Sequence, residues 1–346
     1  MPSRMIEIDG AYGEGGGQLV RTAVALSAIT GKAIRVINVR PKRDKPGLAP
    51  QHLAAVRAVA EVCDAHTEGL QLGAAAFVFS PGALKGGTFR FDVGTAGSIT
   101  LVLQALLPVL IMNRAAAHVV VTGGTDVRQA PPADYLGKVI ARHLARLGAS
   151  VRLTILRRGY YPRGGGEIAV ETTPGKLHPG RLSVPGALLR LGGAAHVANL
   201  PGHIADRMRS AALAQFAGLR PEANIAVRVL GHAEAIGQGG AIVAWAETEH
   251  TVLGAARVAE RGVRAEMLGE AVGRELRADL EAGATADVHA GDQLLIYFAL
   301  AGGESSFTTR ELTSHARTAM WLIGRFLPVR FAVEEREGLF HIRVVR

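Results

Sequence analysis

The chain has 346 residues, 48% of them hydrophobic and 20% charged, which excludes a largely disordered protein and predicts two domains or one large domain with an insertion. Aromatic residues make up only 5%, which argues against a protein that reads single strands mainly by aromatic stacking. The 39 Lys and Arg residues outnumber the 30 Asp and Glu residues, and the resulting charge of +9 suits a polyanionic partner such as RNA.

Alternating strand and helix patterns, joined by short connections rich in Gly and Pro, fill the first half of the chain. The elements expected there are strand 5–8, helix 18–26, strand 33–39, helix 51–65, strands 77–79 and 87–92, helix 98–112, strand 117–122, helix 135–147 and strand 151–156. The segment 93–113 carries no charge, but Gly, Gln and Pro interrupt it, so we expect a buried helix and not a membrane span. This order predicts an α+β or α/β fold.

Glycine motifs are absent from about residue 181 to residue 283, and this stretch has strand and helix patterns of its own. Helices are expected at 207–216, 267–281, 292–301 and 313–326, followed by strands at 329–333 and 339–345. We therefore predict a small inserted α+β domain at 182–283, within a large domain formed by 1–181 and 284–346.

Cys63 is the only cysteine, which excludes an intramolecular disulfide and a cysteine metal cage. The first residues also lack the pattern of a signal peptide. Together these features predict a reducing, cytoplasmic compartment.

Two glycine clusters next to acidic residues, Gly13–Gly17 and Gly164–Glu167, hint at an internal repeat. The first lies between a strand and a helix, where backbone amides can bind an anion, although a simple tight turn explains the glycines equally well. It matches neither the P-loop nor the dinucleotide-binding pattern. Glu14 within this cluster makes sense mainly if a divalent metal ion lies between it and a phosphate. Arg21 would lie one helical turn further on, near the same pocket.

The loop 40–48 holds four basic side chains within six residues and is stiffened by two prolines. It is typical of a phosphate-binding loop, but a solvated basic surface would look the same. His315, at the start of an apolar helix, is by composition alone a capping or core residue. No spacing of histidines suggests a zinc site, and no G-x-S-x-G segment supports a serine nucleophile.

Taken in order, these motifs closely resemble the RNA 3'-terminal phosphate cyclase family. The matching segments are 10–18 (GAYGEGGGQ) with Arg21, 40–51, 94–104, 161–167 (YPRGGGE), 292–293, His315 and 326–331 (FLPVRF). They run through the chain from residue 5 to about residue 331 and are weak only in the expected insert.

The resemblance implies an α+β fold of three βαβαββ-type repeats, similar to the C-terminal domain of translation initiation factor three and related to enolpyruvyl-transferases. It places a smaller α+β domain inside the third repeat. It also implies an ATP-dependent reaction in which a histidine forms histidyl-AMP, AMP passes to an RNA 3'-phosphate, and the 2'-OH displaces it to leave a 2',3'-cyclic phosphate. AMP and diphosphate are released.

The resemblance also implies roles for individual residues. His315 matches the nucleophile and Glu14 the acid that contacts a divalent metal, Mg²⁺ or Mn²⁺. The ATP-contacting positions are matched by Gln104, Pro131, His289, Ala290, Gly291, Asp292 and Gln293. The polar cluster around the phosphates of ATP and of the RNA end is matched by Arg21, Arg40, Arg43 and Gln51. The chain departs from the family at His289, where Tyr is frequent beside the base, and at Ala319, where Asn is frequent.

Two other functions stay open at this point. One branch of the family serves in ribosome assembly without catalysis, but that branch lacks the histidine. An enolpyruvyl-like transferase would need no histidyl-AMP. The expected partners are RNA with a 3'-phosphate end and ATP, with no membrane and no obligate protein partner.

Overall fold

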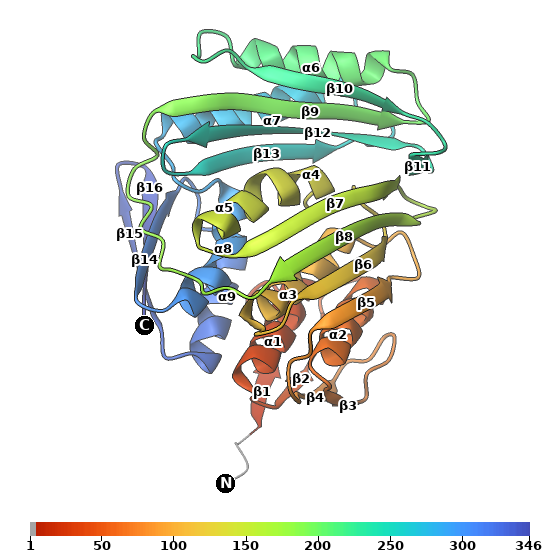
Figure 1. Ribbon diagram of the computed structural model, residues 1–346, viewed down its shortest axis with the longest axis vertical. Helices are drawn as coiled ribbons and strands as arrows, with labels where there is room; N and C mark the ends of the chain where they lie inside the picture. Colours follow the sequence, from red (N-terminus) through yellow and green to blue (C-terminus); the bar gives the residue numbers. More distant parts are fainter. Residues whose placement is uncertain (1–4) are drawn as a thin grey trace.

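The computed structural model describes residues 5–346, which form three repeats beneath a separate upper sheet (Figure 1). The first repeat consists of β1 (Ile6–Asp9), α1 (Gly17–Thr30), β2 (Ile34–Ile37), α2 (Pro50–Val62), β3 (His66–Glu68) and β4 (Phe77–Ser80). Its strands lie in the order β1-β2-β4-β3, with β1 and β2 parallel and the other pairs antiparallel.

The second repeat has the same order of elements. It consists of β5 (Gly87–Asp92), α3 (Ile99–Met112), β6 (Ala117–Gly123), a helix built from α4 (Ala133–Tyr135), η1 (Leu136–Ile140) and α5 (Ala141–Arg146), then β7 (Ser150–Gly159) and β8 (Gly166–Thr173). The strand order is β5-β6-β8-β7, and again only the first pair is parallel. A short strand from later in the chain, β11 (Ala235–Ile236), pairs in parallel with β7 at the edge of this sheet.

The third repeat consists of α8 (Val288–Ala301), β14 (Glu304–Thr309), α9 (Ser314–Phe326), β15 (Arg330–Arg336) and β16 (Leu339–Val345). Its strand order is β14-β16-β15, and the place of the first strand is taken by a parallel bridge between Arg181 and Ser306. The pattern therefore repeats three times, and the βαβαββ fold expected from the resemblance is confirmed.

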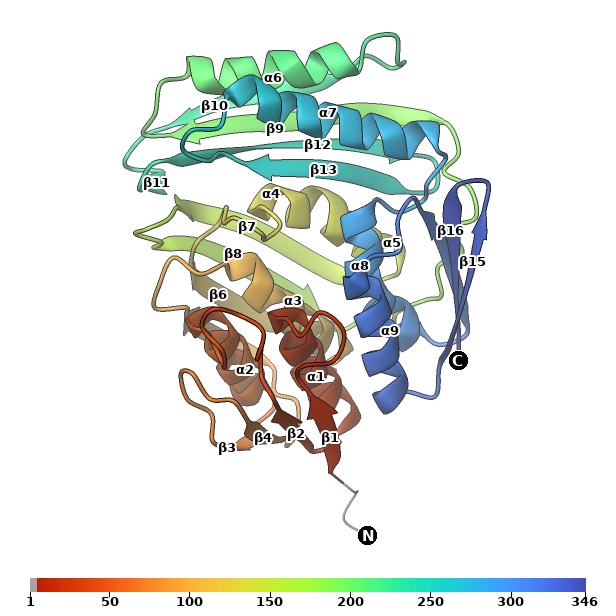
Figure 2. The same cartoon turned by 180° about the vertical axis from the view of Figure 1, so that it is seen from behind.

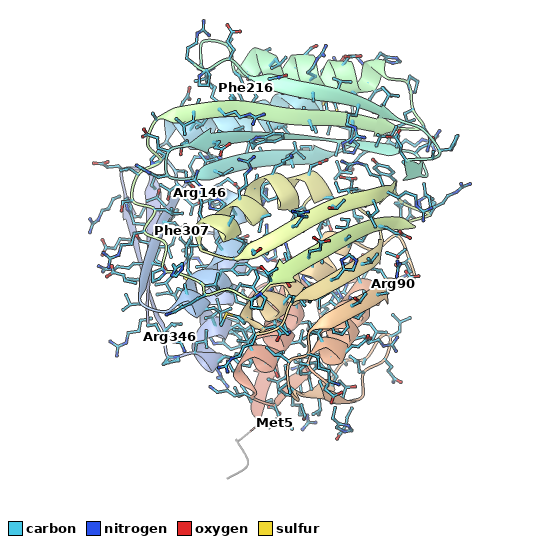
Figure 3. All side chains as sticks on the ribbon, viewed as in Figure 1. Met5, Arg90, Arg146, Phe216, Phe307 and Arg346 are labelled. Atoms are coloured by element: carbon cyan, nitrogen blue, oxygen red, sulfur yellow. The ribbon has the colours of Figure 1, made fainter. Side chains whose placement is uncertain are left out.

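Between residue 182 and residue 285 the chain forms the upper sheet. The elements of this segment are β9 (Leu188–Ala198), α6 (His203–Gln215), β10 (Asn224–Leu230), β11 (Ala235–Ile236), β12 (Gly239–Thr248), β13 (Val252–Val258) and α7 (Ala265–Glu281). Both ends of the segment meet, because the Thr285 hydroxyl donates a hydrogen bond of 2.9 Å to the Leu182 carbonyl. Phe216 belongs to a core within this segment and Phe307 to the main core, and the two lie far apart (Figure 3). The domain boundaries at 182 and 283 stay a prediction.

α3 forms the centre of the main core. Ser98 caps its N-terminus by accepting a hydrogen bond of 3.2 Å from the Leu101 amide, and eleven of its fourteen residues are buried. α1, α2 and α8 all pack against it, and α9 packs against α1 and α8 (Figure 2). The uncharged segment 93–113 is thus a core helix and its flanking turns, as expected. No helix among residues 5–346 is long and apolar enough to cross a bilayer.

Several sequence expectations need correction. The strands β3, β8, β14 and those of the upper sheet were not predicted, because they are short or their glycines hide the alternation. The helix expected to begin at Asp292 begins at Val288, since Asp287 caps it by accepting hydrogen bonds from the amides of His289 and Ala290. The two glycine clusters are not equivalent, because Gly13–Gly17 follows β1 of its repeat, whereas Gly164–Glu167 ends a hairpin between β7 and β8.

Candidate active site

A cleft of about 1070 Å³ opens where the three repeats and the upper sheet meet. The Gly-rich loop after β1, the loop 40–51, α3, the loop before α4 and the first turns of α8 and α9 form most of its walls. It brings together eleven of the predicted site residues: Glu14, Arg21, Arg40, Arg43, Gln51, Gln104, Pro131, His289, Asp292, Gln293 and His315. Ala290 and Gly291 do not line it. Both lie on the core side of α8, where Ala290 is fully buried and Gly291 faces Phe307.

His315 stands in the first turn of α9, which Thr313 caps by accepting a hydrogen bond of 2.9 Å from the Ala316 amide. Its Nδ1 lies 2.6 Å from Gln18 Oε1 and 2.8 Å from Glu14 Oε2. Because both neighbours are acceptors, Nδ1 carries the ring proton and Nε2 keeps a free lone pair. The imidazole is thereby fixed in the tautomer that can attack an electrophile through Nε2.

The surroundings of His315 favour its neutral form. Burial lowers the pKa of His315, and the positive charges of Arg21 and Arg43 lower it further, while Glu14 acts in the opposite direction. The pKa therefore lies below its usual value of 6.5, and the ring is uncharged at neutral pH. The other carboxylate oxygen of Glu14, Oε1, accepts a hydrogen bond of 2.8 Å from Arg43.

Arg21 is a buried cation without an anion. Its side chain lies at the floor of the cleft, and the whole residue is only 7% exposed. Its Nη2 donates a hydrogen bond of 3.1 Å to Gln104 Oε1, but Nε has no partner and no carboxylate among residues 5–346 pairs with it. Burial lowers the pKa of Arg21 to about 10, so it remains charged at neutral pH. An uncompensated buried charge of this kind is suited to binding a phosphate.

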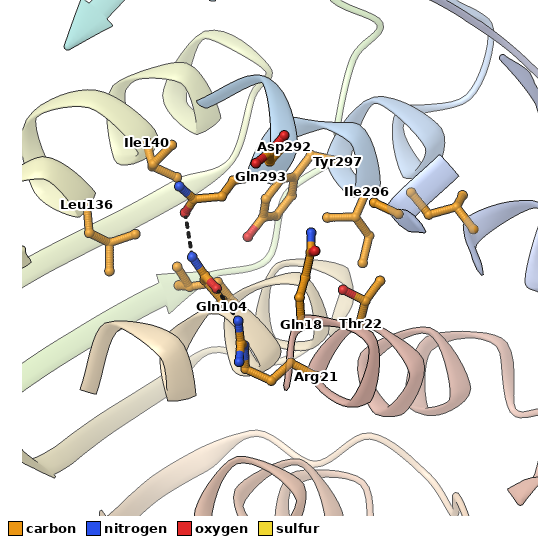
Figure 4. A pocket seen from close by; sticks show the side chains of 13 residues that line it. Gln18, Arg21, Thr22, Gln104, Leu136, Ile140, Asp292, Gln293, Ile296 and Tyr297 are labelled. Carbon is orange, nitrogen blue, oxygen red and sulfur yellow. Dashed lines mark hydrogen bonds between the residues drawn. The ribbon is translucent and has the colours of Figure 1, made fainter. Parts of the chain in front are cut away.

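Three amide side chains and a proline connect the walls. Gln104 accepts the hydrogen bond from Arg21 and donates one of 3.0 Å from Nε2 to Gln293 Oε1, so it links α1, α3 and α8 (Figure 4). Gln51 Oε1 accepts a hydrogen bond of 3.3 Å from the Ser98 amide. The carbonyl of Pro131 accepts a hydrogen bond of 2.7 Å from the Thr100 hydroxyl, which holds the proline over α3.

The basic loop 40–48 reaches into the cleft from the opposite wall. Arg40 Nη1 donates a hydrogen bond of 2.7 Å to the Gly47 carbonyl, which ties the loop together. Burial, and next the charge of Arg43, lower the pKa of Arg40. Because two guanidinium groups are held close enough to affect each other, the loop is arranged for a polyanion.

Asp292 and His289 of α8, and Ala319 of α9, each have a distinctive environment beside the cleft. Burial raises the pKa of Asp292 to about 7, against the opposing effect of a 2.5 Å hydrogen bond from the Thr313 hydroxyl. His289 is half exposed and its Nε2 lies 3.5 Å from Glu275 Oε1, so its ring is partly fixed on the side of α7. Ala319 is buried beneath the cleft, next to a small cavity lined also by Gln18 and Arg21 (Figure 4).

Sequence reasoning missed part of the lining. His52 is buried against the Gly-rich loop, and burial together with the nearby arginines lowers its pKa to about 3, which makes it a neutral group. The upper sheet supplies Arg257 of β13 and, beyond it, Glu260, which pairs with Arg128 at 3.0 Å across the cleft. Gln18 lies within the 10–18 motif, but nothing in the sequence indicates that residues between 256 and 268 line the same cleft as His315.

One group of side chains has the residue types of a metal centre, but its carboxylates are already paired with an arginine. Asp126, Asp134 and His196 lie within ligand distance of one another at the junction of the second repeat and the upper sheet. The guanidinium of Arg158 already pairs with both carboxylates, at 3.0 Å and 2.6 Å. Glu14 is the better candidate for a metal ligand, because it lines the cleft and Arg43 pairs with its Oε1 only, which leaves Oε2, 2.8 Å from His315 Nδ1, without a guanidinium partner.

Comparisons with known proteins agree over almost the whole chain. The profile described as RNA 3'-terminal phosphate cyclase matches residues 12–333. A protein of that name from Nitrosospira multiformis is 51% identical and the match covers 98% of this chain and 96% of the relative. Another from Pyrobaculum neutrophilum is 43% identical, covering 98% of each chain, and one from Methanopyrus kandleri is 44% identical, covering 96% of each.

A solved structure, the enolpyruvyl transferase NikO from Streptomyces tendae, superimposes with a TM-score of 0.39 and 11% identity. It covers 98% of this chain and 48% of that chain. A likeness this loose supports no argument about fold or function.

Proposed function

The chain belongs to the RNA 3'-terminal phosphate cyclase family, and from that premise we propose that it converts an RNA 3'-terminal phosphate into a 2',3'-cyclic phosphate with ATP. AMP and diphosphate are the other products. The observation that carries the proposal is the position of His315, whose ring Gln18 and Glu14 hold with Nε2 free. The same cleft holds Arg21, a buried arginine without a carboxylate partner among the described residues.

In the first step, Nε2 of His315 attacks the α-phosphorus of ATP, a P–N bond forms, and diphosphate leaves. A neutral imidazole is nucleophilic at physiological pH, and the phosphoramidate it forms is reactive enough to pass AMP on. As Nε2 becomes bonded to phosphorus, positive charge develops on the ring, and Glu14 Oε2 at 2.8 Å from Nδ1 stabilises it.

In the second step, an oxygen of the RNA 3'-phosphate attacks the phosphorus of the bound AMP, and the imidazole leaves. In the third, the 2'-OH attacks the RNA phosphorus, AMP departs with the electron pair of the P–O bond, and the hydroxyl proton passes to solvent. Attack within one ribose gains an effective concentration on the order of 10⁵ M or more, so the enzyme need not activate water.

The remaining cleft residues fit supporting roles in this reaction. Arg21, Arg40 and Arg43 bind phosphate oxygens of ATP and of the RNA end together with Gln51. Gln104, Pro131, His289, Asp292 and Gln293 line the cleft, and we assign them to the nucleoside of ATP. Ala290 and Gly291 do not line the cleft, so we assign them no contact with ATP. Glu14 would hold a divalent metal ion, Mg²⁺ or Mn²⁺, which supplies positive charge beside the phosphates. We place the reaction in the cytoplasm, where RNA and ATP are both present.

The test is incubation with ATP labelled in its α-phosphate, followed by denaturing electrophoresis. Label should stay on the wild-type chain and leave in acid, as phosphoramidates do. His315→Ala should carry none, because loss of a covalent nucleophile removes essentially all turnover. Labelling of His315→Ala at the wild-type level would show that His315 is not the nucleophile. Absence of label from the wild type would rule out the proposed reaction.

The order of steps is tested by a second substrate. An oligonucleotide whose last sugar is a 2'-deoxyribose 3'-phosphate should accept AMP and stop as the adenylated end, because it has no 2'-OH. The all-ribose oligonucleotide should become resistant to phosphatase. If the deoxy end accumulates no adenylate while the ribose end cyclises, the free adenylated intermediate is wrong.

A further inference from the structure

The hairpin tip between β7 and β8, residues 161–163, belongs to the YPRGGGE motif and has no part in the proposed reaction. Tyr161 is 79% exposed, the largest exposed fraction among the exposed large apolar side chains of residues 5–346. Pro162 and Arg163 are exposed as well. The tip therefore presents an aromatic ring and a guanidinium group to solvent, side by side in the chain.

The residues on either side of the tip, Tyr160 and Gly164, are anchored. Tyr160 is buried, and its carbonyl accepts a hydrogen bond of 2.8 Å from the Gly164 amide. Gly164 has a φ of 64°, and a Cβ there would lie 2.8 Å from the Thr95 carbonyl oxygen. Because the flanking residues are anchored, binding through Tyr161 would cost little additional ordering of the chain.

The anchor of the tip is continuous with the cleft wall. Thr95 and Ala96, against which Gly164 packs, belong to the turn that leads to Ser98. The Ser98 amide donates its hydrogen bond to Gln51, which lines the cleft. The hairpin tip, the turn 94–97 and Gln51 thus form a chain of direct contacts. The turn is exposed at Gly94 and Thr95, so an RNA strand whose terminal phosphate binds at Gln51 would pass over it toward the tip.

The charge at the tip is available for a phosphate. Arg157 and Arg158 on the same hairpin are both paired, the first with Glu167 at 3.5 Å and the second with Asp126 and Asp134. In contrast, the ion pairs that the described residues form on this hairpin involve Arg152, Arg157 and Arg158 but not Arg163. A phosphodiester can therefore bind Arg163 without first displacing an internal partner.

We propose that the hairpin tip binds the single-stranded RNA that precedes the terminal phosphate, with Tyr161 stacking on a base and Arg163 contacting a phosphodiester. The inference rests on the proposed function, because it assigns the path of that RNA substrate. Stacking on one ring tolerates every base, so the surface extends the contact with the strand and does not select a sequence. It also explains how a chain with few aromatic residues can still hold a single strand.

The test compares two oligoribonucleotides with 3'-phosphate ends, one of about ten nucleotides and one of two, since single-strand sites span about 4–16 nucleotides. For each variant, kcat/KM for cyclisation is divided by the rate of self-adenylation from ATP alone. Tyr161→Ala and Arg163→Ala should lower this ratio about tenfold for the longer RNA, within the range measured for one stacked base or one phosphate contact. The ratio for the two-nucleotide substrate should change less than twofold.

Two variants serve as controls. Tyr161→Phe keeps the ring and should retain the wild-type ratio. Arg152→Ala removes an arginine that is 79% exposed at the far end of the same hairpin, and it should leave both substrates unaffected. In a binding assay with a fluorescent ten-nucleotide RNA, Arg163→Ala should also reduce the dependence of log K on log salt by about 0.7.

The outcomes separate the two levels of the proposal. If the wild type neither self-adenylates nor cyclises RNA, the proposed function fails. If the wild type does both and Tyr161→Ala and Arg163→Ala keep the wild-type ratio for the longer RNA, the inference is wrong, and the tip is left for a protein partner. An equal loss for both RNA lengths would also overturn it, because the tip would then act on the reacting end.

Discussion

At the scale of single residues, reactivity depends on which form of His315 the cleft stabilises. Gln18 and Glu14 fix the proton on Nδ1, and burial with the charges of Arg21 and Arg43 lowers the pKa of the ring. The group that must be nucleophilic is therefore kept uncharged, and the groups that must bind phosphate remain charged. Both properties come from the same cluster.

The first prediction concerns pH. Because the pKa of His315 is lowered from 6.5, the reactive neutral ring predominates at pH 6.5, and the rate of self-adenylation should fall only below that value. Arg43→Ala removes a charge that lowers this pKa, so its midpoint should move to higher pH even if the overall rate drops. The measurement is the initial rate of labelling across the pH range. A wild-type midpoint clearly above 6.5 would contradict the prediction.

The second prediction concerns Arg21, whose buried charge has no carboxylate partner among residues 5–346. Replacing an unpaired buried charge by an apolar side chain of similar length removes a desolvation cost. Arg21→Met should therefore melt at the same or a higher temperature than the wild type without nucleotide. It should also lose most of the stabilisation by ATP, which for a ligand at a hundred times its Kd is about 2.7 kcal/mol. Thermal melts with and without ATP give both values.

A lower melting temperature of nucleotide-free Arg21→Met together with a full ATP shift would show that Arg21 serves packing and not phosphate. Arg152→Ala is the matched control, because that arginine is highly exposed and lies far along β7. It should change neither melting curve.

At the scale of elements, the glycine loop and the start of α1 place the catalytic groups. The N-terminus of α1 has no side-chain cap at Gly16, so its amides remain open to the cleft. Gly17 is required for a different reason, since its α-carbon packs directly on the buried His52 imidazole and a Cβ would overlap the ring. The close approach of α1 and α2 at this point brings Gln18 and Arg21 into the cleft.

The third prediction follows from that contact. Gly17→Ala should destabilise the fold by about 1–3 kcal/mol, the usual cost of overpacking, although Ala is the better helix former. Adding His52→Ala should recover part of the loss, because it removes the ring that the new methyl group meets. Urea unfolding measures both.

The control for this prediction is Gly324→Ala. Gly324 also lies in a helix, α9, but nothing surrounds the place of its Cβ, so this change should stabilise the protein by up to about 1 kcal/mol. If Gly17→Ala behaves like Gly324→Ala, the contact with His52 does not limit the loop.

At the scale of the whole molecule, buried polar contacts fasten the segment 182–283 to the repeats. Asp287 accepts hydrogen bonds from the Tyr135 hydroxyl at 2.6 Å and from the Gly254 amide at 2.9 Å, so one carboxylate joins the second repeat, the third repeat and β13. Burial raises the pKa of Asp287 to about 6. Arg158 and His196 form a second junction with Asp126. Through these contacts β13 and the residues after it become a wall of the cleft.

The fourth prediction tests the proposed domain division. Replacing residues 183–284 by a short Gly/Ser linker should leave a protein that unfolds cooperatively, because residues 182 and 285 are adjacent and each part has its own core. Its melting temperature should fall, since Trp245 and Val252 pack into the main core. Labelling by ATP should be lost with the wall that contains Arg257 and Glu260. A chain without any cooperative transition would argue against the division at 182–283.

The sequence by itself determined the elements with strong periodicity and the ordered set of motifs. The helices around Ser98–Met112 and Thr313–Phe326 and the strand Gly87–Asp92 were predicted within a few residues, because local hydrophobic pattern and caps decide them. The same motifs named eleven residues that the fold gathers in one cleft. Their chemical roles stay predictions until the variants above are measured.

Only the tertiary structure decided which distant groups touch. Gln18 and His315 are 297 positions apart, yet their contact sets the tautomer of the proposed nucleophile. Three other features likewise depend on how the repeats pack. Arg257 and Glu260 supply a wall of the cleft, Arg21 is buried without a carboxylate partner among the described residues, and Gly291 faces Phe307 in the core. Periodicity records which face of an element is buried but not which element covers it, so contacts between repeats leave no pattern in the sequence.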